Sequence, residues 1–274
     1  VPITVDTLRA GKHVICEKPS ALSLEENERV IKEAEKADRK VAFCSARMRW
    51  GYATLAREYI NVGALGDIYR IDVRYYRRRG RPGVDIIQDA PWFVSSELAG
   101  GGIVMDMGQY FMDMVLDLAG WPEITSVAGD TYRGHHHDLP EEVPFDVEEH
   151  CTFLARTAGQ LTFSFDLAWI AHSEPLRQVS ILGTEGGIRM TRDKPFAFYA
   201  DKGGPWRWME TTTDWKDSTG GNDHIYQRLI RAIRGEEVSI GTSPKQALAL
   251  TEMTRMALTS AAEKREVTRE QLRE

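Results

Sequence analysis

The sequence lacks several features that mark particular classes of protein. Only three of its 274 residues are cysteine (Cys16, Cys44 and Cys151), too few for a disulfide scaffold and without the spacing of metal ligands. No apolar run approaches the length that a membrane span needs, and residues 1–9 lack a basic segment followed by an apolar one. Internal repeats and low-complexity tracts are also missing. We therefore expect a cytoplasmic protein with unpaired, mostly buried thiols and no membrane partner.

What is present is a composition typical of globular proteins. Hydrophobic residues make up 42% of the chain and charged residues 28%, so the chain can bury a core as one large domain or two ordinary ones. Disordered and collagen-like chains are excluded on the same ground. The formal net charge of −6 argues against nucleic acid as a general partner.

Helix and strand patterns alternate at the start of the chain. Residues 1–11 have the pattern of the end of an amphipathic helix, and the apolar residues 13–16 that follow are typical of a buried parallel strand. A second helix, with the capping-box spacing of Ser23 and Glu26, precedes another buried strand at residues 41–44. This alternation predicts a doubly wound α/β sheet. Two parallel strands alone do not make a stable sheet, so this part is interpreted as an incomplete domain.

After these elements and one further helix, the pattern changes to that of a separate α+β domain. Residues 68–77 alternate apolar and polar side chains, as in a strand with one solvated face. The same alternation returns at residues 147–154, 161–169, 178–182 and 188–191. These segments predict an open, hairpin-connected antiparallel sheet of about six strands. Helices are expected at residues 53–62, between Asn222 and Gly235, and after Ser243, where Pro244 and Gln246 fit a capped start.

A first candidate for chemistry is the Glu17-Lys18-Pro19 segment, which directly follows the first buried strand. In open α/β sheets ligands bind beyond the carboxyl ends of the strands, and Lys18 is predicted to lie there. A partly desolvated lysine at such a place can exchange a proton with a substrate oxygen. An exposed lysine in a proline turn has the same sequence, so position alone leaves both interpretations open.

A second candidate is the Gly100-Gly101-Gly102 segment with the helix that it precedes, which we expect to run to about residue 119. Asp106 and Tyr110 are four residues apart, so a helix places both side chains on one face. A carboxylate next to a phenol in an otherwise apolar segment indicates a polar site. A capped helix with a packed, hydrogen-bonded tyrosine explains the pattern equally well.

Three ordered motifs give the chain a resemblance to a known family. The segments GKHVICEKP, GGGIVMDMGQY and ILGTEGGI occur in this order and at fitting separations. Together they resemble the glucose-fructose oxidoreductase, inositol dehydrogenase and rhizopine catabolism family (Gfo/Idh/MocA) of NAD(P)-dependent oxidoreductases. The resemblance implies a fold of class α/β + α+β. Residues 1–50 would be part of a Rossmann-type dinucleotide-binding domain, and residues 51–274 a substrate-binding and oligomerisation domain with an open antiparallel sheet.

The same resemblance assigns roles to individual residues. It makes Lys18 the catalytic lysine and Asp106 the family's aspartate, and it puts Tyr110 where most members have histidine and those similar to glucose-fructose oxidoreductase have tyrosine. Lys18 and Tyr110 would carry the proton, while Asp106 orients the substrate hydroxyl or tunes the pair. Contacts with the nicotinamide are implied for Glu17, Lys18, Pro19, Arg47, Arg49 and Trp92. Contacts with the substrate are implied for Lys18, Asp106, Tyr110 and His172.

The dinucleotide fingerprint G-x-G-x-x-G occurs nowhere in the sequence. We therefore expect the chain to lack the front of its Rossmann domain together with the pyrophosphate site. One hypothesis is an oxidoreductase that uses NAD or NADP to move hydride to or from the carbon bearing a sugar, cyclitol or polyol hydroxyl. The alternative is a non-catalytic family member that acts as a sugar-binding or self-association module. The family also implies a homodimer or homotetramer formed through the sheet.

The remaining polar and aromatic clusters receive simpler interpretations. The three histidines at positions 135–137 fit a solvated loop, because their spacing matches no standard metal site, and no metal is expected. The basic run from Arg77 to Arg81 fits an exposed strand end, with attraction of an anionic cofactor or sugar acid as the alternative. His224 is a further candidate for a sugar contact. Stacking on a sugar and burial at a subunit interface fit equally well for Trp206, Trp208 and Trp215.

Overall fold

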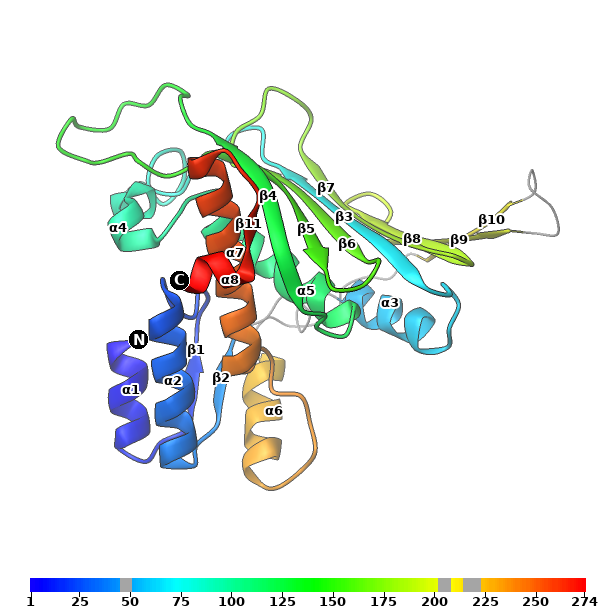
Figure 1. Ribbon diagram of the computed structural model, residues 1–274, viewed down its shortest axis with the longest axis horizontal. Coiled ribbons are helices and arrows are strands. Elements are labelled where there is room, and N and C mark those ends of the chain that lie inside the picture. The colour runs from blue at the N-terminus through cyan, green and yellow to red at the C-terminus, as the bar shows by residue number, and fades with distance from the viewer. Residues whose placement is uncertain (45–50, 202–207, 214–222) are drawn as a thin grey trace.

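The computed structural model describes residues 1–44, 51–201, 208–213 and 223–274. In Figure 1 a small unit built on two parallel strands lies below a large curved sheet, and helix α7 (Pro244–Glu263) reaches from one to the other. The predicted combination of a Rossmann-like part with a separate sheet domain is confirmed. Several residues singled out in the sequence lie outside the described residues: Arg47, Arg49, Trp206, Trp215 and Asn222. The side chains of Trp208 and His224 are likewise not described.

The small unit has the predicted alternation of helix and strand. Its elements are α1 (Pro2–Arg9), β1 (Val14–Cys16), α2 (Leu24–Ala37) and β2 (Val41–Phe43). The two strands are parallel, with Val14 opposite Val41. The Ser23 hydroxyl accepts a hydrogen bond from the Glu26 amide, as the capping box predicts. The reciprocal bond differs, because the Glu26 carboxylate accepts from the Leu22 amide instead.

The small parallel sheet is covered on both faces. Alternate residues of a strand point to opposite sides, and Val41 packs with Leu8 of α1 while Ala42 packs with Ile225 of α6 (Asp223–Ile233). Figure 1 shows α1 and α2 on one side of the strands and α6 on the other. Thr242 also exchanges two backbone hydrogen bonds with Phe43 of β2. Late segments of the chain therefore complete the first unit, while the domain boundary after residue 50 stays a prediction.

The large sheet contains more strands than the sequence predicts. In the described part of the chain nine strands pair in the order β10-β9-β8-β7-β3-β6-β5-β4-β11. Their bounds are β3 (Ile68–Tyr76), β4 (Ile124–Tyr132), β5 (His150–Thr157), β6 (Thr162–Ala168), β7 (Leu176–Gly183), β8 (Gly186–Thr191), β9 (Phe196–Asp201), β10 (Trp208–Thr213) and β11 (Val267–Thr268). The expected count of about six was too low, because β4 and β9 alternate poorly and β11 is only two residues long.

The antiparallel pairing expected for this sheet is found between all neighbouring strands of the described part except one pair. β3 and β6 are neighbours and run parallel, with Tyr76 opposite Ala168. A parallel pair needs a long crossover connection, and here the chain between the two strands forms α5 (Gln109–Leu118), β4 and β5. Consequently the carboxyl ends of β3 and β6 lie side by side at one edge of the sheet.

Helices cover one face of this sheet. Phe111 and Val115 of α5 pack with Ile71 of β3 and Phe163 of β6 in the main hydrophobic core. The remaining helices are α3 (Gly51–Asn61), α4 (Ser96–Ala99) and α8 (Arg269–Arg273), with a short 3-10 turn η2 (Pro91–Val94) and a π-helical turn η3 (Val104–Gly108). The capping box predicted at the start of α7 is complete.

Two expectations concern the chain as a whole. Cys16, Cys44 and Cys151 are free thiols, and the last two are buried, as predicted. Within the described ranges, no helix combines the length and the apolar character needed to cross a membrane.

Candidate active site

The segments that follow the strands β1, β3 and β6 meet around Asp106. Lys18 lies in the segment that follows β1, where the sheet geometry predicts it. Asp106 lies in the middle of the π-helical turn η3, just before α5. Arg77 comes directly after β3 and Trp169 directly after β6, at the adjacent carboxyl ends of these strands. The Arg77 amide donates a hydrogen bond to the Ala168 carbonyl and so links the two strand ends. Such π-turns recur at functional sites, because they change the direction of side chains within a helix.

The Lys18 ammonium is fixed against Asp106. Its Nζ donates to the Asp106 backbone carbonyl at 2.6 Å and to Oδ1 at 3.1 Å. Both side chains are largely buried, with 17% and 12% of their surface exposed. Nζ also lies 4.5 Å from the centre of the Tyr110 ring, a cation–π contact. The structure thus brings together the three predicted catalytic residues, and Lys18 contacts the face of the tyrosine ring.

The second oxygen of Asp106 is held by two residues that the sequence analysis did not assign to the site. Trp169 donates from Nε1 to Oδ2 at 2.9 Å, and an Arg77 guanidinium nitrogen lies 3.6 Å from the same oxygen. Trp169 is fully buried. The signal that could have found both is their place at the ends of neighbouring parallel strands. The hairpin connections predicted for these strands hide that signal.

A pocket of about 310 Å³ opens beside Lys18 and Asp106. Trp92 and Phe93 of η2 form one wall, with their rings stacked at 3.9 Å between centroids. Apolar side chains dominate the remaining lining, which consists of Glu17, Pro19, Leu22, Leu98, Ala99, Gly101, Gly102 and Met105. Four of the residues expected beside the nicotinamide (Glu17, Lys18, Pro19 and Trp92) therefore line the same pocket. Their contact with a cofactor stays a prediction.

His172, the other residue expected to contact substrate, lies elsewhere. It lines a different pocket together with Arg78 and Arg79, and its ring centre is 5.9 Å from that of His135. His172 is not among the residues that line the Lys18 pocket. Its role as a substrate contact stays a prediction that the arrangement of the Lys18 pocket does not favour.

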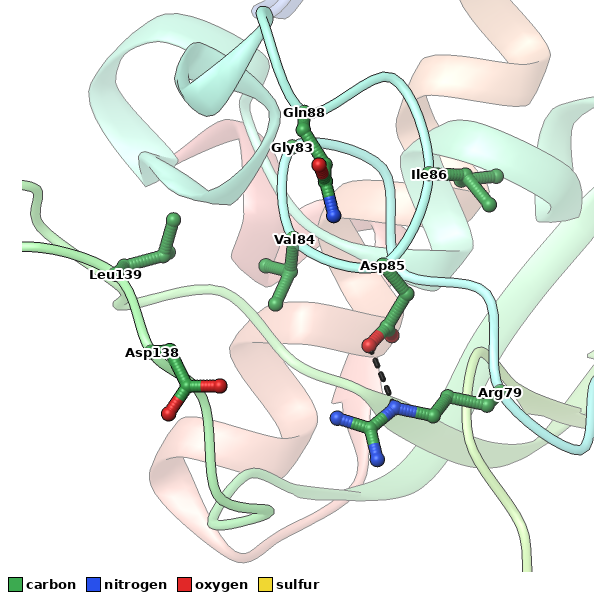
Figure 2. A pocket seen from close by; sticks show the side chains of 8 residues that line it. All are labelled: Arg79, Gly83, Val84, Asp85, Ile86, Gln88, Asp138 and Leu139. Carbon is green, nitrogen blue, oxygen red and sulfur yellow. Dashed lines mark hydrogen bonds and ion pairs between the residues drawn. The ribbon is translucent and has the colours of Figure 1, made fainter.

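The loop that leaves β3 forms a further open pocket of about 560 Å³ (Figure 2). Val84 and Asp85 of this loop face Asp138 and Leu139 across the pocket, and Arg79 pairs with Asp85 at 2.7 Å. The loop begins near Arg77 and leads into η2. Among the residues with described positions, no group of three or more His, Cys, Asp and Glu side chains is arranged to hold a metal ion.

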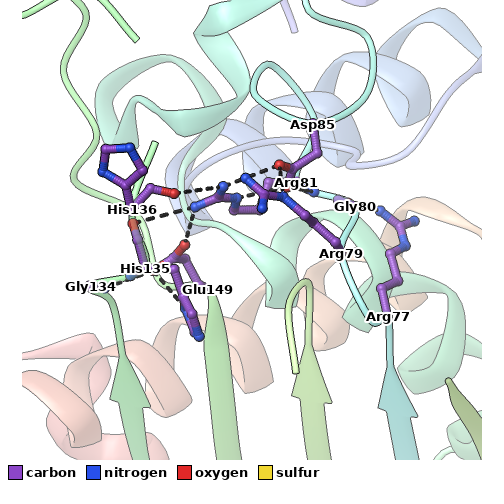
Figure 3. Close-up of polar contacts among 9 residues, drawn as sticks. All are labelled: Arg77, Arg79, Gly80, Arg81, Asp85, Gly134, His135, His136 and Glu149. Carbon is purple, nitrogen blue, oxygen red and sulfur yellow. Dashed lines mark hydrogen bonds and ion pairs between the residues drawn. The ribbon is translucent and has the colours of Figure 1, made fainter. Parts of the chain in front are cut away.

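The interpretation of the basic run as an exposed strand end was wrong for Arg81. Arg81 is fully buried and forms ion pairs at 2.8 Å with both Asp85 and Glu149 (Figure 3). It also donates to the His136 carbonyl at 3.0 Å. A buried guanidinium needs such partners because an unpaired buried charge is very unfavourable. Burial acts to raise the pKa of Asp85, but hydrogen bonds from Arg81 and Arg79 outweigh it and lower this pKa to about 2.

Two family models match the chain. One, described as the GFO/IDH/MocA C-terminal domain, matches residues 54–189. The other, described as an oxidoreductase family with an NAD-binding Rossmann fold, matches residues 1–44. The first range includes Asp106 and Tyr110, and the second includes Lys18.

Individual proteins resemble the chain over parts of their length. It is 33% identical over 131 residues to D-glucoside 3-dehydrogenase of Escherichia coli (strain K12), which covers 47% of this chain and 35% of that protein. It is 35% identical over 123 residues to scyllo-inositol 2-dehydrogenase (NADP(+)) of Bacillus subtilis (strain 168), covering 44% of this chain and 32% of that protein. These matches therefore span about a third of each relative.

The fold is shared with solved structures. Levoglucosan dehydrogenase in complex with NADH and L-sorbose superposes with a TM-score of 0.81 at 21% sequence identity, covering 100% of this chain and 78% of that one. At this level of identity the likeness concerns the fold alone.

Proposed function

Because the chain belongs to the GFO/IDH/MocA family of oxidoreductases, we propose that it carries the proton-transfer site of an NAD(P)-dependent dehydrogenase or reductase. The proposed reaction moves a hydride to or from the carbon that bears a hydroxyl of a sugar, cyclitol or related polyol. The observation that carries the proposal is the Lys18 ammonium, fixed against Asp106 at the wall of a pocket.

Lys18 is suited to hold and move a proton at the substrate oxygen. An ammonium has three N–H donors, and Lys18 uses two of them on Asp106. With respect to the described residues, the third N–H is available to a ligand in the pocket. In reduction of a carbonyl the Lys18 ammonium would donate a proton to the oxygen, and in oxidation of an alcohol the neutral Lys18 amine would accept the hydroxyl proton as the hydride leaves the carbon. A lysine held in place lowers the entropic cost of either step. Tyr110 is proposed as the second member of this proton relay.

Asp106 is proposed to act on Lys18 and not on the substrate. Both of its carboxylate oxygens already accept hydrogen bonds from the protein, Oδ1 from Lys18 and Oδ2 from Trp169. Of the two roles that the family resemblance allows, tuning and positioning the lysine is therefore favoured over orienting the substrate hydroxyl.

The pocket also fits one end of a nicotinamide cofactor. A flat, weakly polar ring suits a cavity with the Trp92 and Phe93 rings on one side and Leu22 and Met105 among its lining residues. Glu17 and Pro19 would hold that ring next to Lys18. When bound, the nicotinamide supplies the hydride or accepts it. The preference between NAD and NADP is left open.

A substrate panel tests this proposal. The native protein is incubated with NAD or NADP and a set of aldoses, anhydrosugars, cyclitols and linear polyols, and the absorbance of the reduced nicotinamide is followed. We expect turnover with members of at least one of these classes. Binding of a sugar without any turnover would support the non-catalytic alternative and contradict the proposal.

A further inference from the structure

We infer that Glu148 is a positioning residue for the proposed proton transfer, because it fixes the turn that carries Asp106. The inference rests on the proposed function. Glu148 lies two residues before β5, and only 7% of its surface is exposed.

Glu148 accepts hydrogen bonds from three successive amides at the start of the Asp106 helix. Its carboxylate oxygens accept from the Gly102 amide at 2.8 Å and from the Val104 amide at 3.1 Å. Its backbone carbonyl accepts from the Ile103 amide at 3.2 Å. The first amides of a helix have no partner within the helix, and a carboxylate at this end also interacts favourably with the helix dipole. Glu148, which is distant in sequence, therefore caps the N-terminus of this helix.

The contact is too close to tolerate a side chain at position 102. A Cβ atom on Gly102 would lie 1.9 Å from the Glu148 carbonyl oxygen. The Gly102 carbonyl in turn accepts from the Asp106 amide at 2.9 Å. Glu148 thus holds Gly102, and Gly102 holds Asp106 one turn further along. Since Lys18 binds both the carbonyl and the carboxylate of Asp106, a shift of this turn would move the ammonium as well.

The next residue, Glu149, supports Asp106 through Trp169. The Glu149 carbonyl accepts from the Trp169 amide at 2.9 Å, and the Trp169 indole holds the Asp106 carboxylate. The Glu149 side chain is itself buried against Arg81 (Figure 3). Glu148 therefore positions Asp106 through the helix start that carries it, and Glu149 positions it through Trp169, whose indole binds the Asp106 carboxylate.

Two substitutions at position 148 test the inference in the native protein. Glu148→Gln keeps one oxygen acceptor but turns an NH2 group toward the other amide, and Glu148→Ala removes both side-chain acceptors. A displacement of about 1 Å in a catalytic group can cost about 100-fold in rate, so we expect kcat to fall about 10- to 100-fold in the Gln variant and further in the Ala variant. KM should change less than kcat, because the aromatic lining residues Trp92 and Phe93 belong to η2 and not to the turn that Glu148 holds.

The matched control is Glu252→Gln. Glu252 is also a buried carboxylate, but it holds Arg269 and Arg273 and does not contact the Asp106 turn. We expect this variant to lose stability and keep its kcat. Equal kcat values for wild type and Glu148→Gln would overturn the inference. A loss of kcat in Glu252→Gln as large as that in Glu148→Gln would also overturn it, because the loss would then come from general destabilisation.

Amide hydrogen exchange separates this inference from the proposed function. At a temperature where all variants are folded, exchange at residues 102–104 should be faster in Glu148→Gln than in the wild type and unchanged in Glu252→Gln. If the native protein transfers no hydride, the proposed function fails, while the exchange result still decides whether Glu148 fixes this turn. Unchanged exchange at these residues would refute the positioning role directly.

Discussion

At the scale of single residues, the proposed site is centred on one carboxylate with several donors. Asp106 accepts from Lys18 through one oxygen and from Trp169 through the other, with Arg77 close by. Hydrogen bonds to charged groups contribute more to stability than neutral ones. The orientation of Lys18 therefore depends on residues that never need to touch a substrate.

Trp169→Phe tests that dependence. The change removes one hydrogen bond to the Asp106 carboxylate and keeps most of the buried aromatic surface. A hydrogen bond to a charged group is worth about 1.5 to 3 kcal/mol, so we expect a fall in kcat of about 10- to 100-fold. Steady-state kinetics on the native protein measure it. The matched control is Trp121→Phe, which removes an indole bond to Asp117. A kcat loss of the same size in the control would argue against a specific role for Trp169.

Asp85 makes the stability of the loop after β3 depend on pH. Its pKa is lowered to about 2 by Arg81 and Arg79 despite its burial, so its ionised form stabilises the folded state. This contribution is complete above the unfolded pKa near 4 and is lost as the pH falls through about 2. Asp85→Asn should therefore unfold more readily at neutral pH, by about 2 kcal/mol, with a gap to wild type that narrows below about pH 4.

Denaturant titrations at a series of pH values measure this gap. The control is Asp138→Asn, since this exposed carboxylate faces the same pocket and does not contact Arg81. Its stability should follow that of the wild type. A gap for Asp85→Asn that stays constant down to about pH 2 would show that the ion pair with Arg81 does not act as described.

At the scale of elements, local sequence patterns predict most of the helices and strands, whereas the pairing of the strands determines which residues meet at the proposed site. The helices after Ser23 and Ser243 and the strands β3, β5, β6, β7 and β8 follow from capping residues and alternation. The pairing of β3 with β6 depends on a crossover of many residues, which no local pattern encodes. Arg77 and Trp169 belong to the site because of that pairing, so the motifs that indicate Lys18 and Asp106 do not indicate these two residues.

The burial of Arg81 illustrates a second limit of the sequence. Four arginines within five residues after a strand are usually solvated, and nothing local indicates that Glu149 lies opposite Arg81. The glycines were easier to interpret. Three in a row indicate close backbone contact, and Gly102 indeed has no room for a side chain.

Gly102→Ala tests the close contact between Gly102 and Glu148. The added Cβ would lie 1.9 Å from a backbone oxygen, so the turn must open and separate from Glu148. Overpacking of this kind costs about 1 to 3 kcal/mol, and we expect a lower denaturant midpoint together with a lower kcat. Gly159→Ala serves as the control, since the nearest atom to its added Cβ is a side-chain oxygen 3.8 Å away. Equal midpoints for the two variants would contradict the close contact.

At the scale of the whole molecule, the two units share a helix and a site. Helix α7 packs against α2 of the small unit and β4 of the large sheet, and Lys18 and Asp106 meet across the same division. The proposed active site therefore requires both units in their observed arrangement. The family model over residues 1–44 describes an NAD-binding Rossmann fold and supports the proposed use of NAD or NADP, while self-association through the large sheet stays a prediction.

Replacement of Lys18 tests whether this residue transfers the proton in the proposed reaction. Hydride transfer by the native protein is compared with that of Lys18→Met, with Lys12→Met, an exposed lysine before β1, as the control. General acid–base catalysis contributes about 100- to 10,000-fold, so Lys18→Met should lose activity by a factor in that range while remaining folded, and Lys12→Met should keep the wild-type rate. Full turnover by Lys18→Met would contradict the proposed role of Lys18.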